Sequence, residues 1–227
     1  MIRIDQPYLG LIMAIPLLTF TIQHIIARKK INVQQFSLKK SKMAPLFLSI
    51  LLPILFGLIV HTYLFTTNGG SFLFIERNQL FFFLGIGLTV AAFSAGLEEI
   101  IWRGYYQTRL RMSYSFHKTA IIIAFLWSIW HLPIAYFYKG YTNLLIGTVS
   151  YFMILFITSY VLSYLREWSG SVIPVALFHG LMNVFYFHDG IQIEMPLHMT
   201  ELVKCLCLLL FFAAGIILLR ATNFIKI

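Results

Sequence analysis

Long apolar runs alternate with short polar connections along the whole 227-residue chain. Because a helix rises about 1.5 Å per residue, roughly 20 apolar residues are enough to cross the hydrocarbon core of a bilayer. Seven runs approach this length, and their bounds are Pro7–Ala27, Ala44–Phe65, Leu80–Arg103 or beyond, Thr119–Phe137, Tyr141–Leu165, Ser171–Phe187 and Leu202–Leu219. The alternation with a period of two that is typical of a membrane β-barrel is absent. The pattern predicts an all-α polytopic transmembrane bundle of about seven spans, with eight as the alternative.

The composition agrees with this prediction and excludes a soluble protein. Hydrophobic residues make up 59% of the chain and charged residues 11%, whereas about a quarter of the residues in a soluble domain are charged. No long polar block that could fold as a second domain interrupts the apolar runs. We therefore expect a single membrane domain over residues 1–227.

The net charge of +9 comes from basic residues in the short connections between apolar runs. They do not form the single stripe that a nucleic-acid partner would need, so we expect a lipid bilayer as the partner and no nucleic acid. Placing the N-terminus outside puts twelve of the 17 basic residues on the cytoplasmic side, namely Arg28, Lys29, Lys30, Lys39, Lys40, Lys42, Arg109, Arg111, Lys118, Arg166, Arg220 and Lys226. Arg3, Arg77, Lys139 and Lys204 then lie outside. The bias predicts an N-out, C-in topology and a cell membrane location.

A few polar residues lie inside apolar runs, where an ionisable side chain costs roughly 2.5–3.5 kcal/mol on insertion scales. They are Glu98, Glu99 and Arg103 in the third run, His131 in the fourth, and His179 and Asn183 in the sixth. Residues that are so unfavourable in a membrane usually have partners and a function. The pattern indicates one polar site shared by three helices. The alternatives are a structural ion pair and ordinary hydrogen bonds between helices.

The spacing of these residues shows which of them share a helix face. Glu99 and Arg103 are four residues apart, the favourable order for an ion pair, and Glu98 is rotated by about 100° from Glu99. The two acids are therefore expected to have different surroundings. His179 and Asn183 are also four residues apart, so both side chains project from one face and could donate hydrogen bonds to an oxyanion.

The depth of the residues in the bilayer gives a second test. If the third helix ended at Trp102, Glu98 would lie near the membrane surface, far from His131. If the helix continues through residues 104–111, Glu98 lies about 16 Å from Arg109, and His179 lies about 14 Å from Gly170. We therefore expect a long third helix, which also places Arg103 inside the membrane beside Glu99.

Three short motifs in this order resemble those of a known family. The segment EEIIWR at residues 98–103 fits EExxxR, Trp127–His131 fits FxxxH with Trp in place of Phe, and His179–Asn183 fits HxxxN. The chain resembles the CAAX protease and bacteriocin-processing (CPBP, or Abi) family of membrane proteases, which includes the Ras-converting CAAX endopeptidase. The resemblance covers a motif-bearing core of approximately residues 80–190.

The resemblance implies an intramembrane endopeptidase that hydrolyses a peptide bond of a membrane-associated or leader-type peptide. Glu98 and His131 would activate a water molecule, His179 and Asn183 would stabilise the oxyanion, and Glu99 and Arg103 would complete the first motif. The family has been described both as metal-dependent and as a metal-free glutamate protease. Either no cofactor or one zinc ion is therefore expected, and zinc would be held by Glu98, His131 and His179. Asn183 suits an oxyanion donor better than a zinc ligand, which favours the metal-free form.

Two other functions fit the same fold. One is a non-catalytic immunity or regulatory scaffold that binds a peptide or membrane protein without cutting it, and the other is a small transporter. The shorter members that this chain resembles are bacterial and are linked to maturation of, or immunity to, secreted bacteriocin or signalling peptides. The resemblance thus favours the bacterial cytoplasmic membrane and a peptide substrate. The identity of the substrate and the oligomeric state are not predicted.

Overall fold

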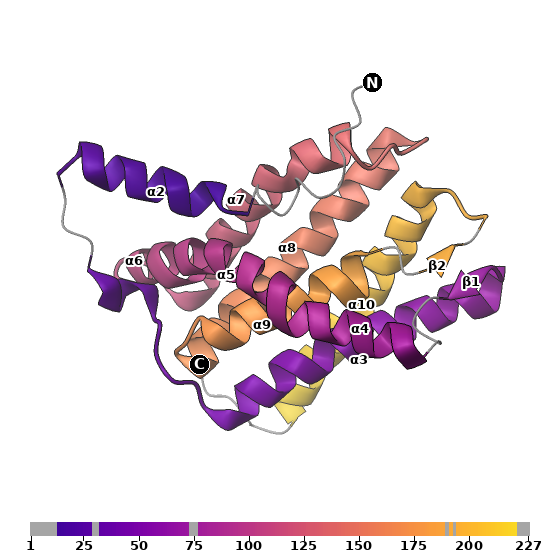
Figure 1. Cartoon of the computed structure of the whole chain (residues 1–227), viewed down its shortest axis with the longest axis horizontal. Helices are drawn as coiled ribbons and strands as arrows, with labels where there is room; N and C mark the ends of the chain where they lie inside the picture. Colours follow the sequence, from indigo (N-terminus) through magenta and orange to yellow (C-terminus); the bar gives the residue numbers. More distant parts are fainter. Residues whose placement is uncertain (1–12, 29–31, 73–76, 189–190, 193, 222–227) are drawn as a thin grey trace.

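The structure is a computed structural model that describes residues 13–28, 32–72, 77–188, 191–192 and 194–221. These residues form a bundle of helices (Figure 1). The helical elements are α2 (Ile15–Ile26), η2 (Val33–Phe36), α3 (Met43–Asn68), α4 (Arg77–Ile86), η4 (Gly87–Ala91), α5 (Ala92–Glu99), η5 (Ile100–Tyr106), α6 (Gln107–Arg111), α7 (Phe116–Phe137), α8 (Leu144–Ser169), α9 (Ile173–Met182), η6 (Asn183–Phe187) and α10 (Leu197–Ala221). Two-residue strands, β1 (Ser71–Phe72) and β2 (Ile191–Gln192), pair antiparallel between the helix connections. The predicted all-α class is confirmed.

Five helices in the described part of the chain are long and apolar enough to cross a membrane. They are Met43–Asn68, Asn78–Arg111, Phe116–Phe137, Leu144–Ser169 and Leu197–Ile217. They correspond to the second, third, fourth, fifth and seventh predicted runs. The first and sixth runs contain shorter apolar helices, Ile15–Ile26 and Ile173–Phe187, and residues 7–12 of the first run lie outside the described residues. The total of seven or eight spans and the N-out orientation stay predictions.

The third run forms one continuous helix from Arg77 to Arg111, through α4, η4, α5, η5 and α6. The expectation that this helix continues past Arg103 is confirmed. Two of its segments, η4 and η5, are π-helical, and η6 is a third π-helical segment. Such wide turns are rare and often occur at functional sites. Here they carry two of the candidate residues, because Arg103 lies in η5 and Asn183 begins η6.

Several predicted boundaries differ from the observed ones by three or more residues, and two of the helix starts show why. The helix α8 begins at Leu144 instead of Tyr141, because the side chain of Asn143 caps it by accepting a hydrogen bond from the backbone N–H of Ile146 at 3.1 Å. The helix α10 begins at Leu197, five residues before the predicted start at Leu202. Its first turns are polar, so hydropathy marks only the apolar part of a helix that begins earlier.

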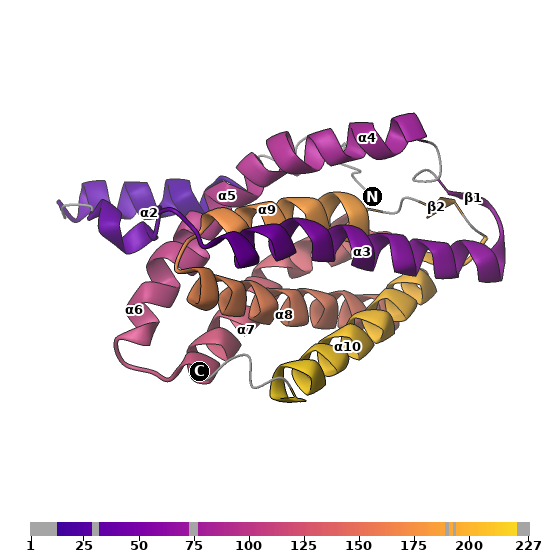
Figure 2. The ribbon, with the colours of Figure 1, turned by 90° about the horizontal axis from the view of Figure 1, so that it is seen from below.

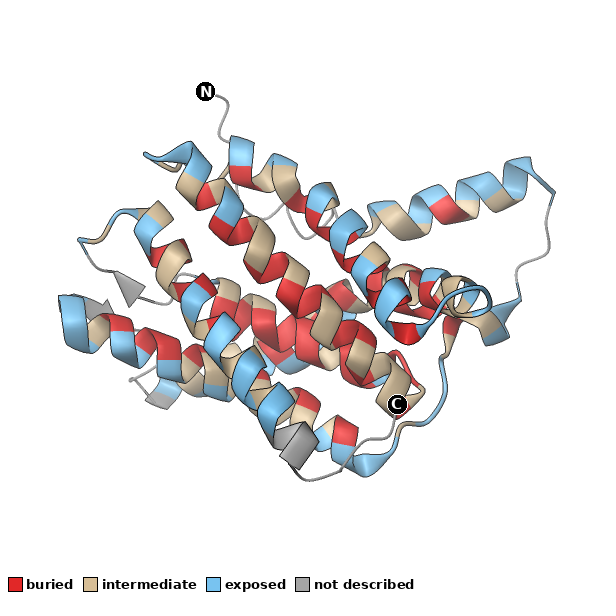
Figure 3. Cartoon of the chain, turned by 180° about the vertical axis from the view of Figure 1, so that it is seen from behind, coloured by how far each residue is buried: buried red, intermediate tan, exposed pale blue. Residues whose placement is uncertain are grey.

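The helix α9 lies inside the bundle, where it packs against α3, α5 and α8. Figure 2 shows it running alongside α3, with α5 on one side and α8 on the other. Buried residues concentrate where these helices meet, while large apolar side chains such as Phe93, Leu145 and Leu210 are exposed on the outside (Figure 3). Apolar side chains outside and charged side chains inside are the arrangement expected of a protein surrounded by lipid.

The close approach of α9 to α5 depends on Gly180. A Cβ atom on this residue would lie 2.4 Å from the backbone N of Ala92 and 2.5 Å from its Cα atom. A backbone cannot move aside as the end of a flexible side chain can. The contact lies at the first residue of α5, and His179, which directly precedes Gly180, contacts Glu99 at the other end of the same helix.

We expect Gly180→Ala to lower the free energy of unfolding by about 3 kcal/mol, because the added methyl group forces the two backbones apart. Thermal unfolding of the detergent-solubilised protein measures the change. Gly85→Ala is the matched control, since a Cβ atom at this helical glycine meets nothing within 4 Å and should stabilise the protein by up to about 1 kcal/mol. Equal effects of the two substitutions would contradict the proposed contact.

Candidate active site

The structure brings the candidate residues of the three runs to adjoining helices in the bundle. Glu98 and Glu99 end α5, Arg103 lies in η5, His131 in α7, His179 in α9, and Asn183 begins η6. Both acids and the arginine have no exposed surface, and the two histidines are at most 6% exposed. The predicted polar site therefore exists as a buried group of side chains.

Glu99 connects Arg103 to His179. The Arg103 Nη1 atom lies 2.8 Å from Oε1 and 2.9 Å from Oε2 of Glu99, so the predicted ion pair is confirmed. The Nδ1 atom of His179 lies 2.8 Å from Oε1 of the same carboxylate. Because an ionised carboxylate only accepts hydrogen bonds, Nδ1 of His179 must carry the hydrogen. This leaves Nε2 as the histidine atom that can contact another group.

The second arm of Arg103 is held by α8. Its Nη2 atom donates to the carbonyl oxygen of Ser159 at 3.2 Å and to Oγ of Ser159 at 2.5 Å. With one nitrogen on Glu99 and the other on Ser159, both the plane and the position of the guanidinium are defined. Arg103 thus connects η5 to α8 as well as pairing with Glu99.

Two further contacts repeat this pairing toward the end of the helix. Gln107 Nε2 donates to the carbonyl oxygen of Ser163 at 2.9 Å, and Arg111 Nε donates to Glu167 Oε1 at 3.1 Å. Together with the contact to Ser159, each pair is separated by 56 residues in the sequence. The constant separation means that the long third helix and α8 keep one register over about two turns.

Glu98 has different partners from its neighbour, as the spacing predicts. Its Oε2 atom accepts a hydrogen bond from the indole N–H of Trp127 at 3.2 Å. Its Oε1 atom is buried without a hydrogen-bond partner in the described part of the chain, and it faces Nε2 of His131 at 3.9 Å. This distance is too long for a hydrogen bond but suits a water molecule that contacts both atoms.

The orientation of His131 is set by its own helix. Its Nδ1 atom lies 2.8 Å from the carbonyl oxygen of Trp127, and a carbonyl oxygen can only accept. The hydrogen of the neutral imidazole is therefore on Nδ1, and Nε2 presents a lone pair toward Glu98. Glu98 Oε1 and His131 Nε2 are two acceptors that face each other.

Asn183 lies one turn after His179 and is half-buried. Among the contacts of the described residues, its side chain makes no hydrogen bond to Glu98, Glu99 or either histidine. The structure shows the shared helix and the predicted spacing but does not bring this amide into contact with the other candidates. Its role as an oxyanion donor stays a prediction.

The group of possible metal ligands differs from the predicted set. Among the described residues, ligand atoms of Glu98, Glu99 and His179 lie within 4.8 Å of one another, and His131 is not part of this group. Both oxygens of Glu99 already accept from Arg103, and the His179 atom nearest to it is the protonated Nδ1. A guanidinium cation beside the carboxylate is unfavourable for a second cation. The donors nearest to one another fit zinc poorly in this arrangement.

Comparisons with known proteins agree with the three motifs. Residues 77–185 match the model of a family described as "type II CAAX prenyl endopeptidase Rce1-like". The match covers slightly less than half of the chain and includes all three motifs. A similar protein is "CAAX prenyl protease 2" of Methanococcus maripaludis, which is 29% identical over 147 residues. The match includes 62% of this chain and 51% of the relative, so the chain spans about half the length of the curated relative that it matches.

The matched segment contains two residues whose contacts the sequence did not reveal. Trp127 occupies the aromatic position of the second motif, but nothing in the pattern predicts that its N–H reaches Glu98. Ser159 belongs to a run rich in hydroxyl groups, and no motif singles it out as the partner of Arg103. Both contacts depend on how neighbouring helices are rotated against each other.

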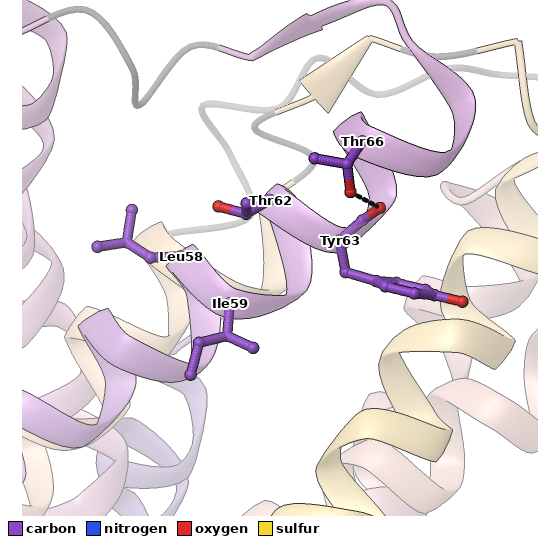
Figure 4. A pocket seen from close by; sticks show the side chains of 5 residues that line it. All are labelled: Leu58, Ile59, Thr62, Tyr63 and Thr66. Carbon is purple, nitrogen blue, oxygen red and sulfur yellow. Dashed lines mark hydrogen bonds between the residues drawn. The ribbon is translucent and has the colours of Figure 1, made fainter.

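A surface hollow on α3 is separate from this buried group of candidate residues. Its volume is about 380 Å³, and it is lined by Leu58, Ile59, Thr62, Tyr63 and Thr66 (Figure 4). The hydroxyl of Thr66 donates back to the carbonyl oxygen of Tyr63 at 3.0 Å. None of the candidate residues lines the hollow, and it presents neither a carboxylate nor an imidazole. It has no groups for acid–base chemistry of the kind that the motifs imply.

Removing Arg103 should be costly because it leaves the buried carboxylate of Glu99 without its cation. We expect Arg103→Met to lower the free energy of unfolding by about 3–5 kcal/mol. The double variant Glu99→Leu/Arg103→Met, which removes both charges, should recover a large part of this loss. Thermal unfolding in detergent compares the two proteins, and a double variant no more stable than the single one would contradict a buried ion pair.

Proposed function

We propose that this chain is an intramembrane endopeptidase in which Glu98 and His131 activate a water molecule. The observation that carries the proposal is the pair of buried acceptors, Glu98 Oε1 and His131 Nε2, which face each other at 3.9 Å. The family whose model residues 77–185 match supports the reaction class. Hydrolysis of a peptide bond requires a water molecule, a base and a stabilised oxyanion.

Water between these two atoms would be oriented by both of them. It would donate one hydrogen to Oε1 of Glu98 and the other to Nε2 of His131, because both atoms are acceptors. Its lone pairs would then point away from both residues, toward a substrate carbonyl carbon. When the water oxygen bonds to that carbon, Glu98 takes the proton. The proton then passes to the leaving amine as the C–N bond breaks, which yields a carboxylic acid and an amine.

His179 is suited to stabilise the oxyanion if it carries two hydrogens. Its Nδ1–H is used by Glu99, so a hydrogen bond to the substrate must come from Nε2–H. An imidazole with both hydrogens is a cation, which would attract the negative charge of the oxyanion. We assign to Arg103 the task of holding Glu99 in place, and to Asn183 the second donor, which follows from the spacing of HxxxN alone.

We propose a reaction without a metal ion. The support is the donor chemistry: Glu99 is bound by Arg103, and His179 directs a protonated nitrogen at Glu99. If zinc were bound by Glu98, His131 and His179 instead, it would supply a Lewis acid and an activated water. Cleavage should therefore persist after treatment with 1,10-phenanthroline and dialysis. Loss of cleavage that added zinc restores would contradict the metal-free proposal.

The substrate is proposed to be a peptide that is itself associated with the membrane. The matched relative is called a CAAX prenyl protease, so a prenylated C-terminal peptide is one member of this class, and a leader-type peptide is another. We place the protein in a cell membrane. The N-out, C-in topology is proposed from the charge pattern, and the bacterial cytoplasmic membrane is proposed from the resemblance to the shorter bacterial members of the family.

The test is cleavage of membrane-associated peptides by the protein in liposomes. A panel of farnesylated CAAX peptides, their unprenylated forms and leader-type peptides is analysed by mass spectrometry. In water labelled with ¹⁸O, one labelled oxygen should enter each new carboxyl group. Glu98→Gln should lower the rate by about 10²–10⁴-fold, because the amide cannot take the proton and this is the usual contribution of a general acid or base.

A folded and inserted Glu98→Gln protein that still cleaves would exclude Glu98 as the base. If the unaltered protein binds peptides from the panel but cuts none, the non-catalytic scaffold becomes the better description. Circular dichroism and size-exclusion chromatography check that the variant is folded.

A further inference from the structure

Trp127 contacts every charged or imidazole side chain that the proposed reaction uses except Glu99. It is fully buried in α7, one turn before His131. Its indole N–H donates to Glu98 Oε2 at 3.2 Å, and its carbonyl oxygen accepts from His131 Nδ1 at 2.8 Å. One residue thus sets both the orientation of the Glu98 carboxylate and the tautomer of His131.

The indole ring also packs against the cation and the second histidine. The guanidinium carbon of Arg103 lies 5.1 Å from the centre of the ring, within the range of a cation–π contact. The rings of His131 and His179 meet the indole edge-on, with centres 4.3 and 5.4 Å away. The ring therefore fills the space among the helices that carry these residues.

The motif that the chain resembles has Phe at this position. A phenyl ring would keep most of the packing, and the backbone carbonyl would still hold His131. Only the N–H bond to Glu98 requires Trp. The presence of Trp instead of Phe at this position therefore adds one hydrogen bond, from the indole N–H to Glu98.

We propose that Trp127 is a positioning residue that fixes the rotation of the Glu98 carboxylate. Its indole N–H holds one carboxylate oxygen at 3.2 Å, so that the other oxygen faces His131 Nε2. The torsion of a carboxylate about its last bond is broad, so without this bond the carboxylate plane can rotate away from the position in which one oxygen faces the histidine. The effect of Trp127 on the rate of cleavage rests on the proposed function, whereas its hydrogen bond to Glu98 can be measured without any cleavage.

Trp102 offers a matched control. It also belongs to the apolar cluster around Trp127, and its rings pack against Trp130 and Tyr106. Its indole nitrogen is buried and has no hydrogen-bond partner among the residues that the structure describes. Trp102→Phe therefore removes the same atoms as Trp127→Phe without removing a bond to a carboxylate.

We expect Trp127→Phe to lower kcat by about 10- to 100-fold, the range for loss of a hydrogen bond to a charged group. KM should change by less than about 2-fold, because the substrate does not contact the indole nitrogen in the proposed arrangement. Trp102→Phe should leave kcat within about 2-fold of the unaltered protein. Equal values of kcat for the two variants, or an unchanged kcat in Trp127→Phe, would overturn the proposal.

A second measurement does not depend on cleavage. The ¹H–¹⁵N spectrum of the indole groups is recorded for the protein in detergent. The chain has four tryptophans, so Trp102→Phe, Trp130→Phe and Trp168→Phe identify three signals, and the fourth belongs to Trp127. Glu98→Gln replaces the charged acceptor by a neutral one, so the Trp127 signal should move while the Trp102 signal stays. An unmoved Trp127 signal would overturn the proposal, even if Trp127→Phe failed to fold.

The two measurements separate this inference from the proposed function. If the Trp127 signal moves but Glu98→Gln still cleaves peptides, the hydrogen bond exists and the proposed role of Glu98 as the base is wrong. If Glu98→Gln is inactive but the signal stays, the base assignment stands and Trp127 does not position it.

Discussion

The buried ion pair of Glu99 and Arg103 is the interaction on which the rest of the site depends. Neither side chain has any exposed surface, and removing two charges from water is favourable only when each charge has further hydrogen-bond partners. Those partners come from other helices: Ser159 of α8 binds the arginine, and His179 of α9 binds the glutamate. The need to compensate two charges thus fixes three helices against one another and sets the direction of the imidazole.

The same constraint explains what the sequence could predict. Glu99 and Arg103 are one turn apart on one helix, so helical geometry alone brings them together. The continuous third helix could be predicted for a related reason, because only a long helix places both acids at the depth of His131 and His179. Contacts within a helix, and the depth of a residue along it, follow from periodicity and length.

Contacts between helices could not be predicted in the same way. The bonds from His179 to Glu99 and from Trp127 to Glu98 depend on the rotation and separation of helices, and these are set by packing. Gly180 shows why: the absence of a Cβ atom lets α9 approach the backbone of α5, and no motif identifies a glycine as that contact point. Asn183 remains a prediction for the same reason, since shared spacing does not show what its amide touches.

The two neighbouring acids differ in how completely their oxygens are bound, and this difference separates structure from chemistry. Both oxygens of Glu99 have partners, so this carboxylate is held in place. Glu98 has one bound oxygen and one that is buried without a partner in the described residues. This second oxygen faces Nε2 of His131 at 3.9 Å, a distance that a water molecule in contact with both atoms would span. The unsatisfied oxygen therefore favours Glu98 as the group that binds and deprotonates water, and it leaves to Glu99 the task of holding His179.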